Sequence, residues 1–206
     1  MLEKLIVLVE EPSMETALAL LLPKILGSTD FQIIRFQCKD DLLKQLPDRL
    51  RGYQAWLPAN WALIVLLDRD DDDCRLLKQQ LEKIAVNAGL VTKTKAGVGH
   101  SFRVANRIAI EELEAWYFGD WPAVQAAYPR VPGTTPQKAP FRDPDAIRGG
   151  TWESFERELK KSGYFKTGLR KFECARAIAP HMDVARNQSR SFQEFRAAVS
   201  AAMAWV

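Results

Sequence analysis

Acidic residues follow two apolar runs that are typical of buried strands. The first run, Leu5–Val9, is followed by Glu10. The second run, Ala62–Leu67, is followed by Asp68, with Asp70 two residues later. In open α/β sheets ligands bind in the crevice at the carboxyl ends of the strands, and hard cations such as Mg²⁺ take oxygen ligands. The sequence therefore predicts a divalent metal site at this edge of a sheet.

The spacing of these acids indicates which of them face the site. Glu10 and Glu11 point to opposite sides if the strand continues through them, and we expect Glu10 to face the crevice because it directly follows the last apolar residue. Asp68 and Asp70 are two residues apart and could share a face, binding one cation or flanking two. A two-metal site positions a water or hydroxide and stabilises the leaving oxygen in phosphodiester cleavage.

Four consecutive aspartates, Asp70 to Asp73, start at the second predicted strand end. Carboxylates in the first turn of a helix accept bonds from its free N–H groups and complement its dipole. We assign this helix-capping role to Asp71 and Asp73. Asp72 remains a candidate metal ligand.

Two further residues are candidates for the same site. Glu114 lies between Leu113 and Trp116, which we expect to be buried, and a buried carboxylate needs a partner such as a metal, its water or a basic side chain. A salt bridge on the helix surface is the alternative. Lys166 lies in a short loop after Gly163, where its ammonium could contact a phosphate, with a solvated lysine as the alternative.

The sequence contains no motif for zinc binding, serine hydrolase activity or ATP hydrolysis. His100 and His181 are the only histidines, and neither lies in a zinc-binding spacing. The chain has no G-x-S-x-G motif and no G-x-x-x-x-G-K-[ST] phosphate loop, so we expect it not to hydrolyse ATP itself. The net charge is only +3, but basic residues outnumber acidic ones between Arg157 and Arg196. A basic face beside an acidic site suits a polyanion processed with a cation's help, and a solvated helical surface is the alternative.

Apolar periodicity predicts strands and helices in alternation over the first part of the chain. Such alternation implies a doubly wound, mainly parallel α/β sheet. Ser13 is the expected N-cap of the first helix, and Pro47 should kink or end the second. The expected strands cover 5–9, 31–36, 62–67 and 102–110, and the expected helices cover 13–26, 40–50, about 71–88 and 111–118.

The sequence predicts that the remainder of the chain forms a helical extension. Prolines and glycines between Tyr128 and Gly150 predict a long loop or a seam. Helices are expected over 152–159, 169–178 and 191–205. We therefore divide the chain into an α/β domain at 1–127 and a loop plus helical extension at 128–206, packed on that domain.

The composition is that of an ordinary globular protein, with 47% hydrophobic and 27% charged residues. No apolar run approaches the ~20 residues of a membrane-spanning helix, and no signal peptide is recognisable at the N-terminus. The three cysteines are scattered and fit neither a disulfide set nor a metal spacing. These features predict a cytoplasmic protein in a reducing environment, without membrane contact.

Five segments resemble one known family, and their order along the chain is more specific than any one of them. The family is the bacterial proteins of domain of unknown function 4276, which is similar to the Toprim fold of topoisomerases, primases and overcoming-lysogenization-defect nucleases. The resemblance spans nearly the whole chain. The segments are Val9–Glu15, Leu66–Asp70, Ala109–Trp116, Gly163–Lys166 and Arg186–Phe192.

The resemblance implies roles for individual residues. Glu10 corresponds to the Toprim glutamate, and Asp68 and Asp70 correspond to its D-x-D pair, all serving Mg²⁺ or Mn²⁺. Glu114 and Lys166 join them as catalytic candidates. The candidates for contact with nucleic acid or phosphate are Lys166, Arg190 and Ser191.

The resemblance also implies partners. Members of the family are thought to work beside a separately encoded AAA or SMC-like ATPase in phage defence or DNA repair. The family usually has glycine directly after the strand-end glutamate and an acid at the position of Met14, whereas this chain has Glu11 and Met14 there.

Together these features predict a Toprim-like α/β domain with a helical C-terminal extension, acting as a Mg²⁺-dependent nuclease on DNA or RNA. One alternative is a non-catalytic partner subunit of the ATPase system, which keeps the fold and metal site for assembly. Another is a receiver-like signalling domain in which Asp68 accepts a phosphoryl group. The oligomeric state is left open.

Overall fold

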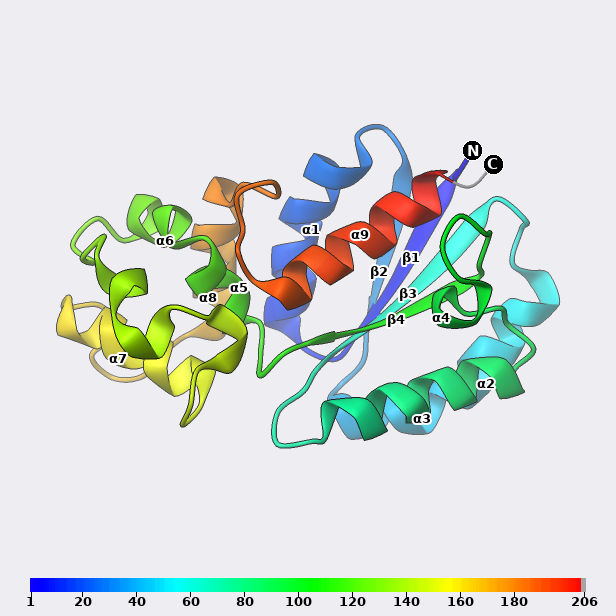
Figure 1. The fold of residues 1–206 in the computed structure, drawn as a ribbon, viewed down its shortest axis with the longest axis horizontal. Helices are drawn as coiled ribbons and strands as arrows, with labels where there is room; N and C mark the ends of the chain where they lie inside the picture. Colours follow the sequence, from blue (N-terminus) through cyan, green and yellow to red (C-terminus); the bar gives the residue numbers. More distant parts are fainter. Residues whose placement is uncertain (205–206) are drawn as a thin grey trace.

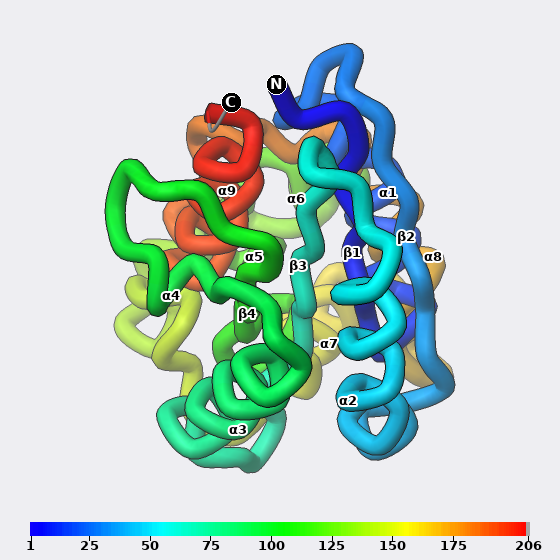
Figure 2. Tube along the Cα trace, turned by 90° about the vertical axis from the view of Figure 1, so that its right-hand side faces the viewer, coloured from blue at the N-terminus to red at the C-terminus, as the bar shows by residue number. Residues whose placement is uncertain are grey.

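A four-stranded parallel sheet forms the centre of the protein in the computed structural model, which describes residues 1–204 (Figure 1). Its strands lie in the order β2-β1-β3-β4, as Figure 2 shows, and every neighbouring pair is parallel. This confirms the doubly wound α/β class. The strands are β1 (Lys4–Val9), β2 (Asp30–Arg35), β3 (Trp61–Asp68) and β4 (Val104–Ala109).

The strand register brings three chain segments to one edge of the sheet. Val9 at the end of β1 pairs with Leu66, and Asp68 at the end of β3 pairs with Ala109 at the end of β4. The residues that follow β1, β3 and β4 therefore emerge side by side, as expected at the carboxyl edge of a parallel sheet.

Helices cover both faces of the sheet (Figures 1 and 2). Alternate residues of β1 enter opposite cores: Leu5 and Val7 pack on one face, and Ile6 and Leu8 on the other. The first face is covered by α1 (Pro12–Leu26) and α9 (Arg190–Ala204), and the second by α2 (Lys39–Trp56) and α3 (Cys74–Asn87). A short helix, α4 (Lys93–Ala96), precedes β4.

A lobe of short helices lies beyond the carboxyl edge of the sheet (left in Figure 1). Its centre is aromatic, with the rings of Phe118, Trp121 and Phe155 in mutual contact. The α-helices of the lobe are α5 (Glu114–Gly119), α6 (Trp121–Ala127), α7 (Thr151–Lys161) and α8 (Lys171–Ile178). Four 3₁₀ turns accompany them, at Thr135–Gln137, Ala139–Phe141, Pro144–Ala146 and Ala179–His181.

Several predicted boundaries were wrong, each for a local reason. The N-cap of α1 is Glu11 and not Ser13, because Pro12 occupies the first turn, where its fixed φ suits a helix. Helix α2 continues through Pro47 to Trp56, since buried residues on both sides of the proline keep the helix against the core. The predicted helix at 111–118 begins only at Glu114, because Glu111 has a φ of 60°.

Other boundaries were close to their predictions. Asp73 is the N-cap of α3, as predicted, whereas Asp71 lies before the cap and makes no capping bond in the described chain. The segment 128–150 contains three 3₁₀ turns within the predicted loop. The last helix was expected to reach Trp205, which lies outside the described residues.

Apolar side chains from both predicted domains share one core. Leu18 of α1 and Ala175 of α8 belong to the same buried cluster, which also includes Phe195 of α9. The boundary between 127 and 128 stays a prediction. No helix among residues 1–204 is long and apolar enough to cross a membrane.

Candidate functional site

Three acidic side chains are buried at the carboxyl edge of the sheet. Glu10 follows β1 and is 7% exposed, Asp68 ends β3 and is 4% exposed, and Glu114 begins α5 and is 0% exposed. A pocket of about 530 Å³ opens over this edge, and its walls include Glu10, Asp68 and Lys171. The structure therefore brings acids from three chain segments to one edge of the fold.

Glu10 connects the ends of the two central strands. Its Oε1 accepts a hydrogen bond of 2.5 Å from the backbone N–H of Asp68. Burial raises the pKa of Glu10 to about 7, against the lowering effects of that bond and of the Lys39 ammonium. This carboxyl group therefore exchanges its proton near neutral pH.

Asp68 and Glu114 carry buried oxygens without partners. Within the described chain, Oδ1 of Asp68 and both carboxylate oxygens of Glu114 make no hydrogen bond. Burial raises the pKa of Asp68 well above its usual range, and the carboxylates of Glu11, Glu10 and Glu114 raise it further. Burial likewise raises the pKa of Glu114 to about 8. Buried polar atoms normally have partners, so these oxygens are suited to a ligand that supplies positive charge.

Asp70 and Asp72 have a partner of their own. Nζ of Lys39, at the start of α2, lies 2.7 Å from Oδ2 of Asp70 and 3.0 Å from Oδ2 of Asp72. It also donates to the backbone carbonyl of Arg69. Asp70 has a φ of 49°, which a helix or strand would not permit. The two aspartates of the D-x-D pair therefore differ, since Asp68 is buried without a cation and Asp70 is exposed and paired with one.

The donor set suits a hard cation, although it is not assembled as a complete shell. The unpartnered atoms are carboxylate oxygens, which Mg²⁺ and Mn²⁺ prefer. Across residues 1–204, no three His, Cys, Asp or Glu side chains are already arranged as ligands of one ion. Asp68 and Glu114 fit such an ion chemically, whereas Asp70 and Asp72 each have Oδ2 engaged by Lys39.

Lys171, at the start of α8, is a site residue that sequence reasoning missed. Its Nζ lies 3.1 Å from Oε1 of Glu112 and 4.0 Å from Oε2 of Glu114. Burial opposes its charge, but the carboxylates of Glu114, Glu11 and Glu112 outweigh burial and raise the pKa of Lys171. Lys171 thus remains a cation beside the acids, and no motif in the sequence marks it.

Lys166, Arg190 and Ser191 lie outside the acidic pocket. Lys166 is exposed in the loop between α7 and α8. Arg190 is exposed, and its backbone N–H donates to Asp145. Oγ of Ser191 donates to Asp145 at 2.7 Å and accepts from the indole N–H of Trp116 at 3.1 Å, which fixes the start of α9. Contact of these three residues with nucleic acid stays a prediction.

A second, larger pocket adjoins the first. Its volume is about 820 Å³, and it shares Asp70 and Asp71 with the acidic pocket. Its walls also include Arg69, Arg148 and Trp152. The two pockets therefore meet at Asp70 and Asp71 and form one depression, whose walls carry both carboxylates and basic side chains.

The sequence family described as "Domain of unknown function (DUF4276)" matches residues 9–200. No curated protein matches the chain.

Three solved structures are similar to the chain, and all are of the C-terminal region of the Xanthomonas campestris pv. campestris OLD protein. The first has 15% sequence identity and a TM-score of 0.47, with 95% of each chain covered. The second has 14% identity and a TM-score of 0.46, covering 97% of this chain and 94% of that one. The third has 14% identity and a TM-score of 0.47, covering 95% and 96%. Similarity at this level carries no conclusion about activity.

Proposed function

The chain belongs to the family described as domain of unknown function 4276, and on this premise we propose that it is a Toprim-type nuclease that hydrolyses phosphodiester bonds with a divalent cation. One observation carries the proposal. Carboxylates from three chain segments meet at the carboxyl edge of the sheet, and those of Asp68 and Glu114 have buried oxygens without partners among the described residues. Buried groups with strongly shifted pKa values beside a pocket are typical of catalytic sites.

Asp68, Glu114 and Glu10 are the residues that would hold Mg²⁺ or Mn²⁺, with Asp70 and Asp72, whose Oδ2 atoms Lys39 contacts, as further ligands. A bound ion of this kind polarises a phosphoryl oxygen and lowers the pKa of water.

The other groups of the site have their own tasks. Oε1 of Glu10 accepts from the Asp68 N–H, so Oε2 is the atom that would take up a proton from the attacking water when Asp68 and Glu114 hold the ion. The Lys171 ammonium contacts a non-bridging phosphate oxygen of the substrate, for which its raised pKa keeps it charged.

Calorimetric titration of Mg²⁺ and Mn²⁺ tests the proposal. We expect the wild type to bind these ions and Asp68→Asn to lose the binding, because this substitution removes a charged oxygen while preserving shape. Asp48→Asn, on an exposed ion pair far along α2, is the matched control and should bind as the wild type does. Cleavage of labelled DNA and RNA is measured in parallel. Cleavage that persists in both Asp68→Asn and Glu10→Gln would contradict the proposed site.

The proposal extends to the setting of the enzyme. We place the enzyme in the cytoplasm, in phage defence or DNA repair. Its partner would be a separately encoded AAA or SMC-like ATPase, because the chain has no phosphate loop of its own. Co-purification of the tagged protein with an ATPase encoded near it tests this partnership.

A non-catalytic subunit is the second candidate function, and Lys39 favours it. Its ammonium is already paired with Asp70 and Asp72 and compensates part of their charge without a metal ion. A complex with the ATPase that forms normally and shows no cleavage with either ion would select this candidate. The receiver alternative is disfavoured because Asp68, at 4% exposed, is poorly accessible to a phosphoryl donor.

A further inference from the structure

Trp152, the second residue of α7, is held next to the acidic site by a carboxylate clamp. Oε2 of Glu112 accepts the backbone N–H of Trp152 at 3.0 Å, and Oε1 of the same carboxylate accepts from Nζ of Lys171 at 3.1 Å. The Lys171 ammonium also lies 5.7 Å from the centroid of the Trp152 ring. Glu112 therefore fixes an aromatic ring and a cation side by side, next to Glu114.

The indole is partly exposed and forms part of the wall of the larger pocket. Gly149 and Gly150, with φ values of 78° and 86°, turn the chain into α7 just before it. Arg148 precedes them, is exposed, and forms no ion pair with any residue between 1 and 204. The wall thus presents a flat ring with a guanidinium available beside it.

Two acids of this pocket are already paired, Glu111 with Arg69 and Glu112 with Lys171. Asp145 and Glu153 also line the pocket, and neither forms an ion pair with a residue between 1 and 204. The acidic centre is shared with the neighbouring pocket through Asp70 and Asp71. A ligand that enters the depression therefore meets an aromatic face next to the proposed phosphodiester site.

We propose that Trp152 stacks on an unpaired nucleobase adjacent to the scissile phosphate, so that single-stranded nucleic acid is the substrate class. The phosphate position rests on the proposed function. In a duplex each base is covered above and below by its neighbours, whereas a single strand leaves base faces free to stack on aromatic side chains. A pocket of about 820 Å³ falls within the ~300–1,000 Å³ of sites for drug-sized ligands, which suits a nucleotide or two.

A scan with abasic oligonucleotides on the wild-type protein tests the stacking directly. Binding of a fluorescein-labelled single-stranded 15-mer is followed by anisotropy in Ca²⁺, and each base in turn is replaced by an abasic site. We expect affinity to fall at one or two adjacent positions and to stay level elsewhere. A matching 15-bp duplex should bind more weakly than the single strand. A level scan, or a duplex that binds equally well, would overturn the inference.

Substitutions connect the sensitive position to Trp152. Trp152→Ala should lower single-strand affinity by about 5- to 150-fold, the measured range for loss of one base–aromatic stack. It should also level the abasic scan, whereas Trp152→Phe should keep most of the affinity and the sensitive position. Trp56→Ala is the control, because Trp56 is also exposed but lies at the end of α2, with its ring 6.0 Å from that of Trp61. A scan that keeps its sensitive position in Trp152→Ala would refute the assignment.

Cleavage measured in Mg²⁺ on the same oligonucleotides separates this inference from the proposed function. Abasic-sensitive binding without any cleavage would support the Trp152 stack and contradict the nuclease. Cleavage with a level abasic scan would support the nuclease and contradict the stack.

Discussion

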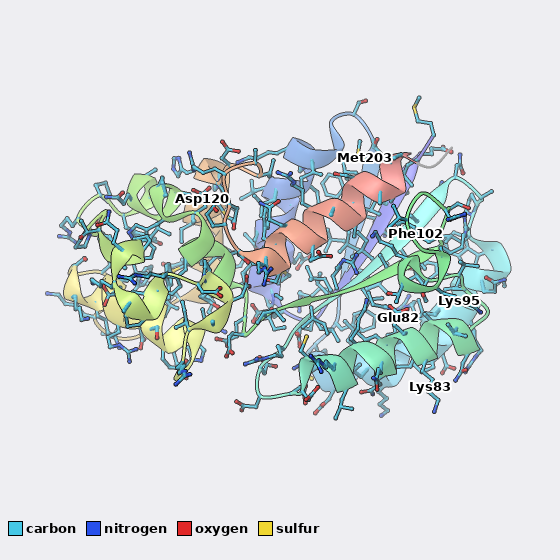
Figure 3. The ribbon with its side chains drawn as sticks, viewed as in Figure 1. Glu82, Lys83, Lys95, Phe102, Asp120 and Met203 are labelled. Carbon is cyan, nitrogen blue, oxygen red and sulfur yellow. The ribbon has the colours of Figure 1, made fainter. Side chains whose placement is uncertain are left out.

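Glu114 and Asp120 mark the two ends of helix α5, and both are fully buried acids. Asp120, labelled in Figure 3, accepts hydrogen bonds through both of its carboxylate oxygens. Arg186 donates to them through Nε at 2.7 Å and Nη2 at 3.1 Å, and the backbone N–H of Asp183 donates at 2.7 Å. Glu114 accepts no hydrogen bond through its carboxylate from any described residue, and its nearest cation, Lys171, is 4.0 Å away.

The two acids show that burial alone does not indicate function. A buried charge persists in a fold when partners compensate its lost hydration, and the partners of Asp120 connect the α5–α6 junction to the chain before α9. That carboxylate is structural. Glu114 has equal burial but only a distant cation, Lys171 at 4.0 Å, so burial raises its pKa to about 8. Uncompensated burial beside a pocket is the feature that distinguishes the candidate site.

The largest expected effect is on stability, from Asp120→Ala. Asp120 is fully buried although its partner Arg186 is 45% exposed, so removing the carboxylate should cost about 3 kcal/mol, because it also leaves the Asp183 N–H without its acceptor. Urea unfolding of the wild type and the variant measures this. Asp48→Ala, which breaks the exposed pair with Arg51, should change stability by less than about 0.5 kcal/mol. Equal losses in the two variants would mean that the Asp120 pair is no more valuable than a surface pair.

Glu114→Gln should increase the stability of the fold, in contrast to Asp120→Ala. The pKa of Glu114 is about 8 in the folded protein against 4.5 ordinarily, so the folded state holds this proton more tightly. Stability is therefore full below pH 4.5 and is lost as the pH rises through about 8. Without divalent ions, the glutamine variant should be more stable than the wild type at pH 8, by roughly a few kcal/mol, and equally stable at pH 4. Unfolding curves at both pH values measure the difference.

Magnesium supplies the control for that result. An ion that binds only the folded state adds stability by mass action, so Mg²⁺ should stabilise the wild type at pH 8 and stabilise Glu114→Gln much less. A stability difference between the two proteins that is the same at every pH would show that Glu114 is not strained by its charge.

The acidic edge could be predicted because its signals are local. Apolar runs of strand length give β1 and β3, and the residue after each run must lie at the carboxyl edge of a parallel sheet. Glu10 and Asp68 follow from this reasoning. Glu114 followed from a different local signal, the apolar residues on both sides of it.

The residues that were missed depend on contacts distant in sequence. Lys171 reaches Glu112 across 59 residues, and Trp152 reaches it across 40. Both contacts exist only because the helical lobe packs beyond the sheet edge, and no periodicity reports that packing. Lys39 was missed as well, because its pairing with Asp70 depends on how α2 packs against the sheet. The position of the acids at the sheet edge could therefore be predicted from the sequence, whereas that of the neighbouring cations could not.

Lys171→Met tests the cation that partly compensates Glu114. The ammonium lowers the pKa of both Glu114 and Asp68, so its loss should raise these values further. The pH at which Mg²⁺ binding reaches half its maximum should then move upward by about one unit, a typical effect of one nearby charge. Calorimetry across a pH series measures it. Lys166→Met is the matched control in the loop before α8 and should leave the midpoint unchanged. A shift of this pH midpoint in Lys166→Met, and not in Lys171→Met, would show that Lys166 and not Lys171 is the cation near the acids.

The smallest effect on stability is expected from removing the carboxylate of Asp73, which is exposed to solvent. Oδ1 of Asp73 accepts the backbone N–H groups of Arg75 and Leu76 at 2.8 and 3.0 Å, and these bonds lower its pKa. Asp73→Ala should lower the Tm by about 2–4 °C, as loss of one helix cap does in a protein of this size. Asp71→Ala, two residues earlier and outside the cap, should leave the Tm nearly unchanged. The Asp73 carboxylate accepts two hydrogen bonds, whereas that of Glu114 accepts none from the described residues. Asp73 is exposed, however, so water can replace its hydrogen bonds when the side chain is removed. The comparison predicts that partners matter most where water is excluded, and equal Tm losses for Asp73→Ala and Asp120→Ala would refute it.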